Sequence, residues 1–338
     1  MSIFLFLLCQ KSQMATVIKK YKVVQTGANT QSGGFKLLFI KDEYHGSLYE
    51  IVAKLPIKEA EYVTTKNRKK DKNLFFSIII YIYHLIMNDK VIWITGASSG
   101  IGKALAIKFA KEGWKVAISA RRENLLNEIA NNNQNIFPFA LDVTDHEKCK
   151  LVFNDIKNKL KNIDISFFCT GMHDPKSEKE LNIEKIKQIM NVNYFGTINS
   201  INAVYNYYKE KKSGQISIVS SVAGYRGLPA GGGYCASKSA LITFAESLYF
   251  DLKRFNVRVS VVSPGFIKTP MTDQNDFPMP MIRSPEFAAD EIFKGLTKSN
   301  SFEIHFPKQF TFIMKILKVM PNWLYLKIVK KGMSLIGR

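Results

Sequence analysis

The chain has 338 residues, of which 46% are hydrophobic and 22% are charged. These ordinary proportions exclude a wholly disordered, collagen-like or coiled-coil protein, and a chain this long can bury a full core without disulfides or metals. Its 48 Lys and Arg residues outnumber 28 Asp and Glu, for a net charge of +20. That charge favours an anionic partner such as a phosphorylated cofactor, an acidic membrane surface or nucleic acid, although a lysine-rich solvated surface explains it equally well.

The four cysteines, Cys9, Cys149, Cys169 and Cys235, form no CxxC pair and match no zinc-binding spacing. The last three lie in apolar or helical segments, where a cysteine acts as a small buried hydrophobe. We therefore expect reduced thiols in a cytoplasmic protein, and no metal site.

Residues 1–86 show poor periodicity and stand apart from the rest of the chain. They contain a basic run at 66–72 and lead into an apolar stretch at 74–87, which is shorter than the roughly 20 residues that cross a bilayer. Two interpretations stay open: a membrane anchor, or a poorly ordered extension or start-site artefact upstream of Met87. We favour the second because a regular pattern begins immediately after Met87.

Strand-like and helix-like segments alternate from Met87 onward. Short apolar runs predict strands at 90–95, 115–120, 136–141, 163–169, 215–220, 257–262 and 301–306. Helical patterns occupy 103–113, 122–131, 145–161 and 234–255, with a longer polar-apolar stretch at 178–212. This alternation is typical of βαβ units. We therefore expect one α/β domain over 87–307: a Rossmann-type, doubly wound parallel sheet of six to seven strands with helices on both faces.

A glycine-rich segment, TGASSGIG at 95–102, follows the first predicted strand and opens the first helix. Gly96 permits a tight turn, Gly100 lets the backbone approach a pyrophosphate, and Gly102 lets helix and strand pack closely. The helix N-terminus then offers free N–H groups and a partial positive charge to phosphates. In this strand-turn-helix context, the pattern predicts a dinucleotide-binding loop.

TGASSGIG resembles the TGxxxGxG loop of the short-chain dehydrogenase/reductase family, and further family motifs follow in order. Asp142 and Val143 resemble the Asp-Val pair after the third strand, whose carboxylate accepts from the adenine amino group. The segment CTG at 169–171 takes the place of the family's Asn-Asn-Ala-Gly, of which only Gly171 is kept. The segment PGFIKT at 264–269 resembles the PGxxxT segment that contacts the nicotinamide amide.

The end of the second predicted strand bears on the choice of cofactor. Enzymes that use NAD place an acidic residue there to hold the ribose 2′-hydroxyl, whereas this chain has Arg121 and Arg122. A guanidinium can bind a 2′-phosphate bidentately, and similar family members use an arginine at the position of Arg121, with Arg122 as a second donor. We therefore expect NADP(H), although two solvated arginines would look the same. The residues implied to bind the cofactor are Gly96, Ser98, Ser99, Gly100, Ile101, Gly102, Arg121, Arg122, Asp142, Val143, Gly171, Tyr234, Lys238, Pro264, Gly265, Ile267 and Thr269.

Tyr234 and Lys238 lie four residues apart, so their side chains share one face of a helix. A phenol has a pKa near 10, and a nearby ammonium lowers it toward the range of a useful base. Ser221 lies thirteen residues before Tyr234 at the end of a predicted strand, on the sheet edge where doubly wound folds bind ligands. The resemblance adds Asn193, the helix asparagine of the family's active-site tetrad.

The resemblance implies a role for each of these four residues. Tyr234 gives or takes the proton of the carbinol oxygen, and Ser221 hydrogen-bonds that oxygen. Lys238 lowers the pKa of Tyr234 and holds the nicotinamide ribose, while Asn193 keeps a water in a relay that returns protons from solvent to Lys238. Because the hydride transfer belongs to the cofactor, we expect an NADP(H)-dependent oxidoreductase that interconverts a carbonyl and a secondary alcohol.

The segment 270–285 follows the last cofactor motif and is expected to cover the substrate. Four apolar side chains fall among its prolines: Met271, Phe277, Met279 and Met281. Thioethers and an aromatic ring favour an adaptable apolar pocket and a lipophilic small-molecule substrate, although ordinary packing would also use them. His173 is either a substrate contact or a solvated loop residue.

Residues 308–338 carry seven basic residues and no acidic ones, mixed with aromatic and aliphatic side chains. Pro321 splits the segment into two short helical pieces. This mixture is typical of an amphipathic segment on a membrane surface, and a helix that covers the core or a subunit interface also fits. We expect a homo-oligomer and no nucleic-acid partner, because the basic residues form no recognised module.

Two alternative functions stay open. A 3-oxoacyl-thioester reductase fits the same fold and the same residues. A non-catalytic, membrane-associated NADP(H)-binding protein is disfavoured, because all four catalytic residues are present at the family's spacing.

Overall fold

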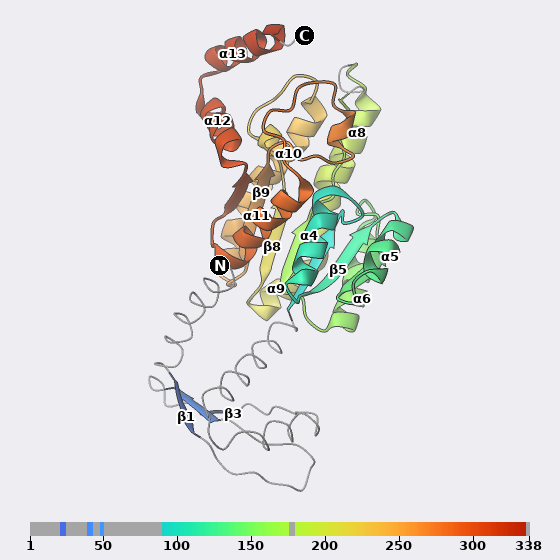
Figure 1. Cartoon of the computed structure of the whole chain (residues 1–338), viewed down its shortest axis with the longest axis vertical. Coiled ribbons are helices and arrows are strands. Elements are labelled where there is room, and N and C mark those ends of the chain that lie inside the picture. Colours follow the sequence, from blue (N-terminus) through green and yellow to red (C-terminus); the bar gives the residue numbers. More distant parts are fainter. Residues whose placement is uncertain (1–20, 25–38, 43–47, 51–89, 176–179, 336–338) are drawn as a thin grey trace, which may run out of the picture. The chain divides into compact units, whose positions relative to one another are not determined.

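The computed structural model describes residues 21–24, 39–42, 48–50, 90–175 and 180–335, within two compact units, Met1–Ile82 and Tyr83–Arg338 (Figure 1). In the first unit, three short strands form an antiparallel sheet in chain order: β1 (Tyr21–Val24), β2 (Phe39–Asp42) and β3 (Leu48–Glu50). Apart from these strands, the expectations about 1–86 and about the apolar stretch at 74–87 lie outside the described residues.

The second unit contains a parallel sheet with the strand order β10-β9-β8-β7-β4-β5-β6. Its strands are β4 (Val91–Thr95), β5 (Lys115–Ala120), β6 (Ile136–Ala140), β7 (Ile165–Phe168), β8 (Gln215–Val219), β9 (Arg258–Pro264) and β10 (Glu303–Phe306). The chain runs outward from β4 to β6, returns to β7 on the other side of β4, and continues outward to β10. The predicted doubly wound parallel sheet of six to seven strands is confirmed, and it has seven strands.

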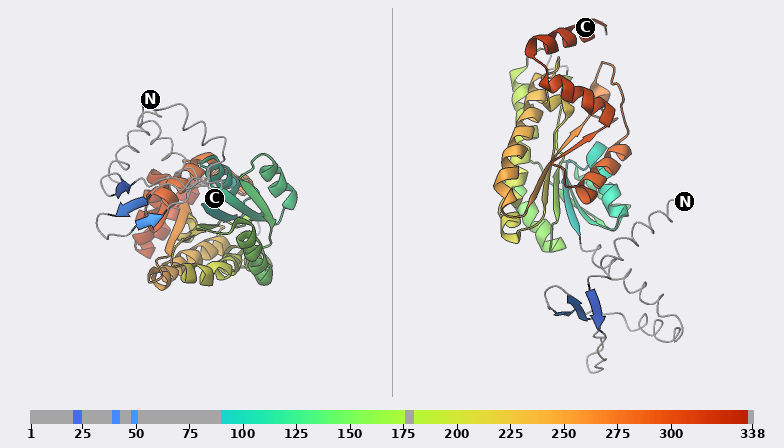
Figure 2. Two further views of the ribbon diagram at one scale, coloured as in Figure 1. Left: turned by 90° about the horizontal axis from the view of Figure 1, so that it is seen from below. Right: turned by 90° about the vertical axis from the view of Figure 1, so that its left-hand side faces the viewer.

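Helices cover both faces of this sheet (Figure 2). They are α4 (Gly100–Lys111), α5 (Glu123–Asn131), α6 (His146–Leu160), α8 (Ile183–Met190), α9 (Gly196–Lys211), α10 (Gly232–Lys253), α11 (Pro285–Lys298), α12 (Lys308–Val319) and α13 (Asn322–Leu335). One hydrophobic cluster joins the sheet to α6, α9 and α10, and a second joins it to α4, α5 and α11. Strand β4 alternates between them: Val91 and Trp93 belong to the first, Ile92 and Ile94 to the second. Burial on both faces explains why its sequence is a continuous apolar run.

The stretch at 178–212 differs from one uninterrupted helix. Asn182 caps α8 by accepting a hydrogen bond from the Lys185 backbone N–H, and a π-helical turn at Asn191–Phe195 then joins α8 to α9. Such turns widen a helix locally and often occur at functional sites. In the tail, Pro321 separates α12 from α13 as predicted.

Within the part of the chain that the structure describes, no helix is both long enough and apolar enough to span a bilayer.

A buried hydrogen bond in the centre of the sheet offers a test of the core. The Trp93 indole Nε1 donates to the Ser119 hydroxyl across 2.9 Å, and both residues are fully buried. Trp93→Phe leaves that hydroxyl without its donor, so we expect the free energy of unfolding to fall by about 1–3 kcal/mol. Ser119→Ala should then lower the free energy of unfolding by less in the Trp93→Phe background than in the wild type, because the indole donor is already absent. Denaturant titration of all four proteins measures this coupling, and strictly additive effects would contradict it.

Candidate active site

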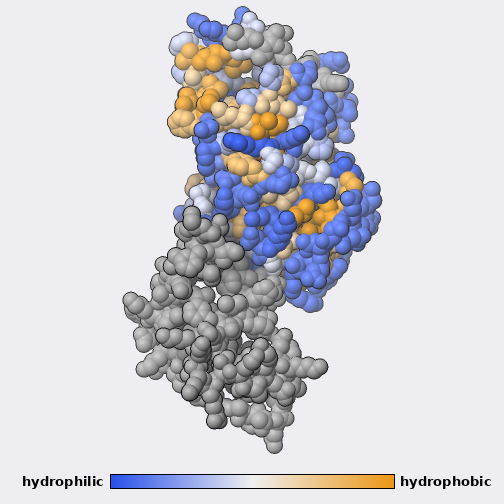
Figure 3. Space-filling model, in the orientation of Figure 1, coloured by the Kyte–Doolittle hydropathy of each residue, from blue (hydrophilic) through white to orange (hydrophobic). Residues whose placement is uncertain are grey.

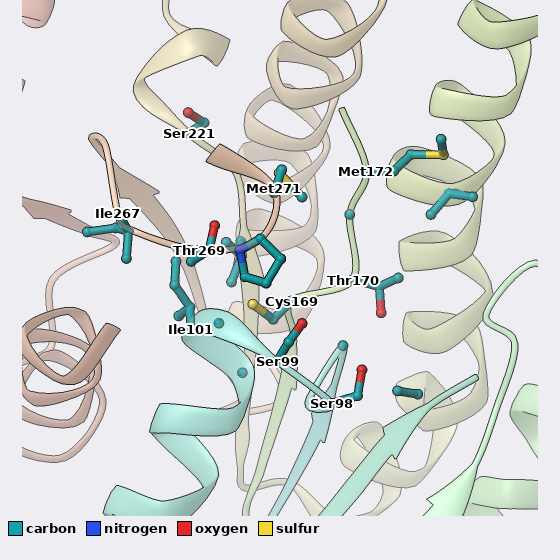
Figure 4. A pocket seen from close by; sticks show the side chains of 18 of the residues that line it. Ser98, Ser99, Ile101, Cys169, Thr170, Met172, Ser221, Ile267, Thr269 and Met271 are labelled. Atoms are coloured by element: carbon teal, nitrogen blue, oxygen red, sulfur yellow. The ribbon is translucent and has the colours of Figure 1, made fainter. Parts of the chain in front are cut away.

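A pocket lies along the carboxyl ends of the parallel strands (Figure 4). Its walls come from the residues that follow β4, β5, β6, β7, β8 and β9, together with Val192, Tyr234 and Lys238. Ser98 and Ser99 lie at one end of the pocket and Ser221 lies at the other. This is the edge, beside the reversal of strand order at β4, where open α/β sheets bind ligands.

Every residue that the sequence assigned to cofactor or catalysis lines this pocket, with the exception of Asn193, which is fully buried beside it. The pocket also takes in residues that the sequence did not single out: Ala120, Leu141, Met172, Val192, Val219, Ser220, Pro270 and Thr272. Most of them are chain neighbours of predicted residues, so the strand-end rule could have found them. Val192 lies on the π-helical turn next to the predicted Asn193, away from any strand end, so the strand-end rule does not reach it.

The glycine loop is held by close backbone contacts. Gly96 has a φ of +68°, and a Cβ there would lie 2.8 Å from the Cys169 carbonyl oxygen after β7. A Cβ on Gly102 would lie 2.5 Å from the Gly96 oxygen. The Ser99 side chain makes no capping hydrogen bond at the start of α4, and the first turn of this helix has no acidic residue. Its N-terminal N–H groups therefore suit an anion.

The arginine at the start of α5 reaches across to this loop. Arg122 Nη2 donates to Ser98 Oγ at 2.8 Å and to Ser99 Oγ at 3.1 Å. Arg121 is exposed and lines the same pocket. The family resemblance assigns the leading contact to Arg121, whereas the structure ties Arg122 to the loop hydroxyls. Both cations therefore stand at the end of the pocket that the glycine loop forms.

Asp142 is fixed at the neighbouring strand end. Its Oδ1 accepts hydrogen bonds from the Thr144 backbone N–H at 3.0 Å and from Thr144 Oγ1 at 2.8 Å. This local turn orients the carboxylate where the residues after β6 form the pocket wall.

The opposite end of the pocket holds the Tyr234–Lys238 pair on the first turns of α10. The Lys238 Nζ lies 5.7 Å from the centre of the Tyr234 ring and donates to the Val219 carbonyl at 2.9 Å. Lys238 is only 4% exposed. This burial lowers its pKa to about 8, against 10.5 in water, because a desolvated ammonium is disfavoured.

Ser221 lies two residues beyond β8 rather than at the end of the strand, which stops at Val219. It caps a 3-10 turn at Val222–Gly224, where its Oγ accepts from the Ala223 N–H at 3.1 Å and donates to the Pro264 carbonyl at 3.5 Å. The turn therefore fixes the hydroxyl at the pocket wall.

Asn193 uses its side-chain amide to join two parts of the site. Its Nδ2 donates to the Met172 carbonyl and to Ser237 Oγ, both at 3.0 Å, and its Oδ1 accepts from the Met172 N–H at 2.7 Å. Because both side-chain N–H groups are engaged by protein, the side chain could hold a relay water only through the remaining lone pair of Oδ1. The loop after β7 is thereby fastened to α10.

With this geometry established, comparison with known proteins identifies the chain. The family model described as short chain dehydrogenase matches residues 90–278, more than half of the sequence. The chain belongs to the short-chain dehydrogenase/reductase family. An uncharacterized oxidoreductase of Myxococcus xanthus is 33% identical over 243 residues, covering 71% of this dehydrogenase/reductase and 96% of the relative.

Further relatives and solved structures agree with this family. The protein named 3-oxoacyl-[acyl-carrier-protein] reductase FabG of Thermotoga maritima is 35% identical over 192 residues, which cover 56% of this chain and 78% of the relative. The structure described as ElxO with NADP bound has a TM-score of 0.58 at 24% identity, over 64% and 97% of the two chains. A 3-ketoacyl-(acyl-carrier-protein) reductase from Brucella melitensis complexed with NADH has a TM-score of 0.60 at 22% identity, over 64% and 96%. The two structures share the fold of this short-chain dehydrogenase/reductase.

A histidine lies beside Tyr234 in this dehydrogenase/reductase. The His173 ring lies 4.5 Å from the Tyr234 ring, and burial lowers the pKa of His173 below its usual value, which favours a neutral imidazole. His173 is thus half-buried next to Tyr234 rather than a solvated loop residue. Met271 lines the pocket, whereas Met281 is 44% exposed.

The buried Lys238 makes the stability of this dehydrogenase/reductase depend on pH. Its folded pKa of about 8 lies below the unfolded value of 10.5, so between these limits the unfolded chain binds more protons. Stability contributed by this group is therefore absent below about pH 8 and increases as the pH rises toward 10.5. We compare a protein that keeps Lys238 with its Lys238→Met variant. The free energy of unfolding of the first, minus that of the second, should grow by up to about 3 kcal/mol over this interval.

Both proteins in that comparison should carry Tyr234→Phe, which removes titration of the neighbouring phenol. Denaturant titrations at several pH values measure the difference. A difference that does not change between pH 8 and 10.5 would show that the ammonium is not desolvated.

Proposed function

We propose that this enzyme is an NADP(H)-dependent oxidoreductase that interconverts a carbonyl and a secondary alcohol on a lipophilic substrate. The observation that carries the proposal is one continuous pocket with two chemically different ends. The glycine loop and the Arg121–Arg122 pair form one end, and the Tyr234–Lys238 pair with Ser221 forms the other. An anionic dinucleotide suits the first end, and proton exchange with a carbinol oxygen suits the second.

The residues present fit an NADP(H) molecule. Gly96 to Gly102 and the start of α4 suit the pyrophosphate, because the loop glycines leave no room for a Cβ and the helix N–H groups lack a side-chain cap. Asp142 suits the adenine, Arg121 and Arg122 suit the 2′-phosphate, and the segment 264–269 suits the nicotinamide amide. When bound, the cofactor supplies or accepts the hydride.

The protein's own side chains handle the proton. In the proposed reaction, the Tyr234 hydroxyl donates its proton to the carbonyl oxygen during reduction and recovers it during oxidation. The Ser221 hydroxyl hydrogen-bonds the same oxygen and stabilises its developing charge. Lys238 supports this exchange because burial brings the pKa of its ammonium to about 8, so that it can lose and regain a proton near neutral pH.

Apolar groups near the reacting end support a lipophilic substrate. Met271 lines the pocket, and the loop that follows it packs through Phe277 against Phe266, with ring centres 6.0 Å apart. The three free thiols that the structure describes, at Cys149, Cys169 and Cys235, support a reducing compartment such as the cytoplasm.

A second candidate is a 3-oxoacyl-thioester reductase, favoured by the 35% identity to the relative of that name from Thermotoga maritima. Oxidation of NADPH followed by absorbance, with simple lipophilic ketones and with 3-oxoacyl thioesters, separates the two candidates. Preference for the thioesters at matched chain length would select the second. Failure to turn over any carbonyl compound in either direction would contradict both.

The Tyr234 assignment predicts a specific kinetic loss. Tyr234→Phe removes the acid/base hydroxyl while keeping the ring against His173, so we expect kcat to fall by roughly 10²–10⁴-fold with nearly unchanged affinity for NADPH. Tyr249→Phe, on the same helix but outside the pocket lining, is the matched control and should leave kcat near the wild-type value. Near-normal turnover of Tyr234→Phe would refute the assignment.

The two arginines predict a preference for NADPH. Wild type should bind NADPH more tightly than NADH, and both Arg121→Asp and Arg122→Ala should reduce the ratio of the two affinities by about tenfold or more, because a charge-assisted contact to the 2′-phosphate is lost. Arg254→Ala and Arg254→Asp, at the end of α10, control for the changes in net charge of one and two units. Fluorescence titration with both cofactors measures the ratio. Equal or tighter binding of NADH by the wild type would overturn the preference.

A further inference from the structure

The C-terminal helices α12 and α13 carry half of the exposed large apolar side chains among the described residues. Four of these side chains lie on α12, at Phe312, Ile313, Ile316 and Val319, and α13 adds Trp323, Leu326 and Ile328. Their exposed fractions run from 41% for Ile328 to 82% for Val319. Figure 3 shows hydrophobic residues gathered at this end of the chain. We call this group of seven the tail surface.

Helix α12 is apolar on two opposite sides. Its inner side packs on the domain through the buried Met314 and Thr311 and the partly buried Phe310 and Leu317. The exposed residues of the tail surface recur along its outer side at spacings of three and four, which is the period of one helix face. A helix that has already buried one side has no structural need for a second apolar face, so this outer stripe indicates a binding surface.

The charge around the stripe has a single sign. Six lysines lie on the two helices: Lys308, Lys315, Lys318, Lys327, Lys330 and Lys331. No acidic residue occurs between 308 and 338. Lys315 is paired with Glu303 of β10 at 2.6 Å, while the other five lysines are exposed. Their long aliphatic stems can follow an apolar surface while the ammonium groups stay in water.

We propose that the tail surface docks this enzyme on an anionic lipid bilayer. Acyl chains would cover the apolar stripe, the amphipathic Trp323 ring would lie at the headgroup level, and anionic headgroups would pair with the lysines. A second copy of the chain matches this surface poorly. A two-fold contact would bring two identical sets of lysines together with no acidic partner in the segment.

The helices that carry the tail surface are bound to the segment between Ser221 and Tyr234. Arg226 donates to the carbonyls of Lys318 and Met320 at 3.1 and 2.9 Å, and its guanidinium lies 4.2 Å from the centre of the Tyr325 ring. The Tyr325 hydroxyl in turn donates to the Gly227 carbonyl at 2.5 Å.

Arg226 and Gly227 belong to the segment between Ser221 and Tyr234. Ser221 and Tyr234 both line the pocket. Docking would thus hold the reacting end of the pocket close to the bilayer, where lipophilic compounds collect. This consequence rests on the proposed function, whereas the docking itself does not.

Cosedimentation of the full chain with vesicles tests the proposal. Vesicles of phosphatidylcholine and phosphatidylserine in a two-to-one mixture should bind the protein, vesicles of phosphatidylcholine alone should bind it far less, and added salt should weaken the binding. Two variants test the apolar side chains and the lysines separately. The first combines Trp323→Ser with Leu326→Ser, and the second combines Lys327→Glu with Lys330→Glu and Lys331→Glu. Each should reduce binding to the mixed vesicles by about tenfold or more.

Matched controls make the same chemical changes elsewhere. Leu151→Ser removes an apolar side chain that is 63% exposed on α6, and the triple change of the exposed Lys111, Lys148 and Lys298 to Glu alters the net charge equally. Both controls should bind like the wild type. Thermal melts and NADPH titration show whether each variant is folded, independently of vesicle binding and of any substrate.

Three results would overturn the proposal. The first is an absence of binding to the anionic vesicles. The second is unchanged binding by both tail variants, which would place the contact elsewhere in the chain. The third is a smaller oligomer in the tail variants by light scattering, without vesicle binding by the wild type, which would assign the surface to a second copy.

Discussion

A buried ammonium holds the reacting end of this enzyme together. Lys238 donates to the carbonyl of Val219, the last residue of β8, and thereby ties α10 to the carboxyl edge of the sheet. A second bond runs in parallel, from the hydroxyl of Ser220 to the carbonyl of Lys238 at 2.7 Å. Tyr234 lies one turn earlier on the same helix, and Ser221 lies two residues after β8, so this junction positions both hydroxyls. The cost is a desolvated cation, which is reflected in the lowered pKa of Lys238.

Gly171 leaves space beside the Lys238 ammonium because it has no side chain. A Cβ on Gly171 would lie 3.4 Å from the Lys238 Nζ and 3.6 Å from Asn193 Oδ1, so a larger side chain there would fill the space beside both. Asn193 holds the Gly171 loop in place through Met172 and reaches α10 through Ser237. The π-helical turn that carries Asn193 thus serves the active site by aiming one amide at two elements. Positioning, rather than direct contact with the reactants, is the role that this geometry supports best for Asn193.

The C-terminal helices contact two segments that adjoin the pocket. Arg226 joins the segment after Ser221 to the junction of α12 and α13. The Phe266 ring, in the segment 264–269 along the pocket wall, lies 5.4 Å from Phe310 of α12 and 6.0 Å from Phe277. Packed side chains and hydrogen bonds therefore connect these helices to both segments.

Local patterns in the sequence determined much of this protein. The seven parallel strands were predicted because a strand buried on both faces must be apolar throughout, and the glycine loop and the Tyr234–Lys238 pair were found because turn geometry and helix spacing are properties of adjacent residues. The strand order, the reach of Arg122 to Ser98 and Ser99, and the ties made by Asn193 and Arg226 were decided by tertiary structure. The hydrogen bonds made by these side chains join residues that are 21 to 96 positions apart. No local periodicity reports such a separation, because it is the packing of helices on the finished sheet that brings those side chains within hydrogen-bonding distance.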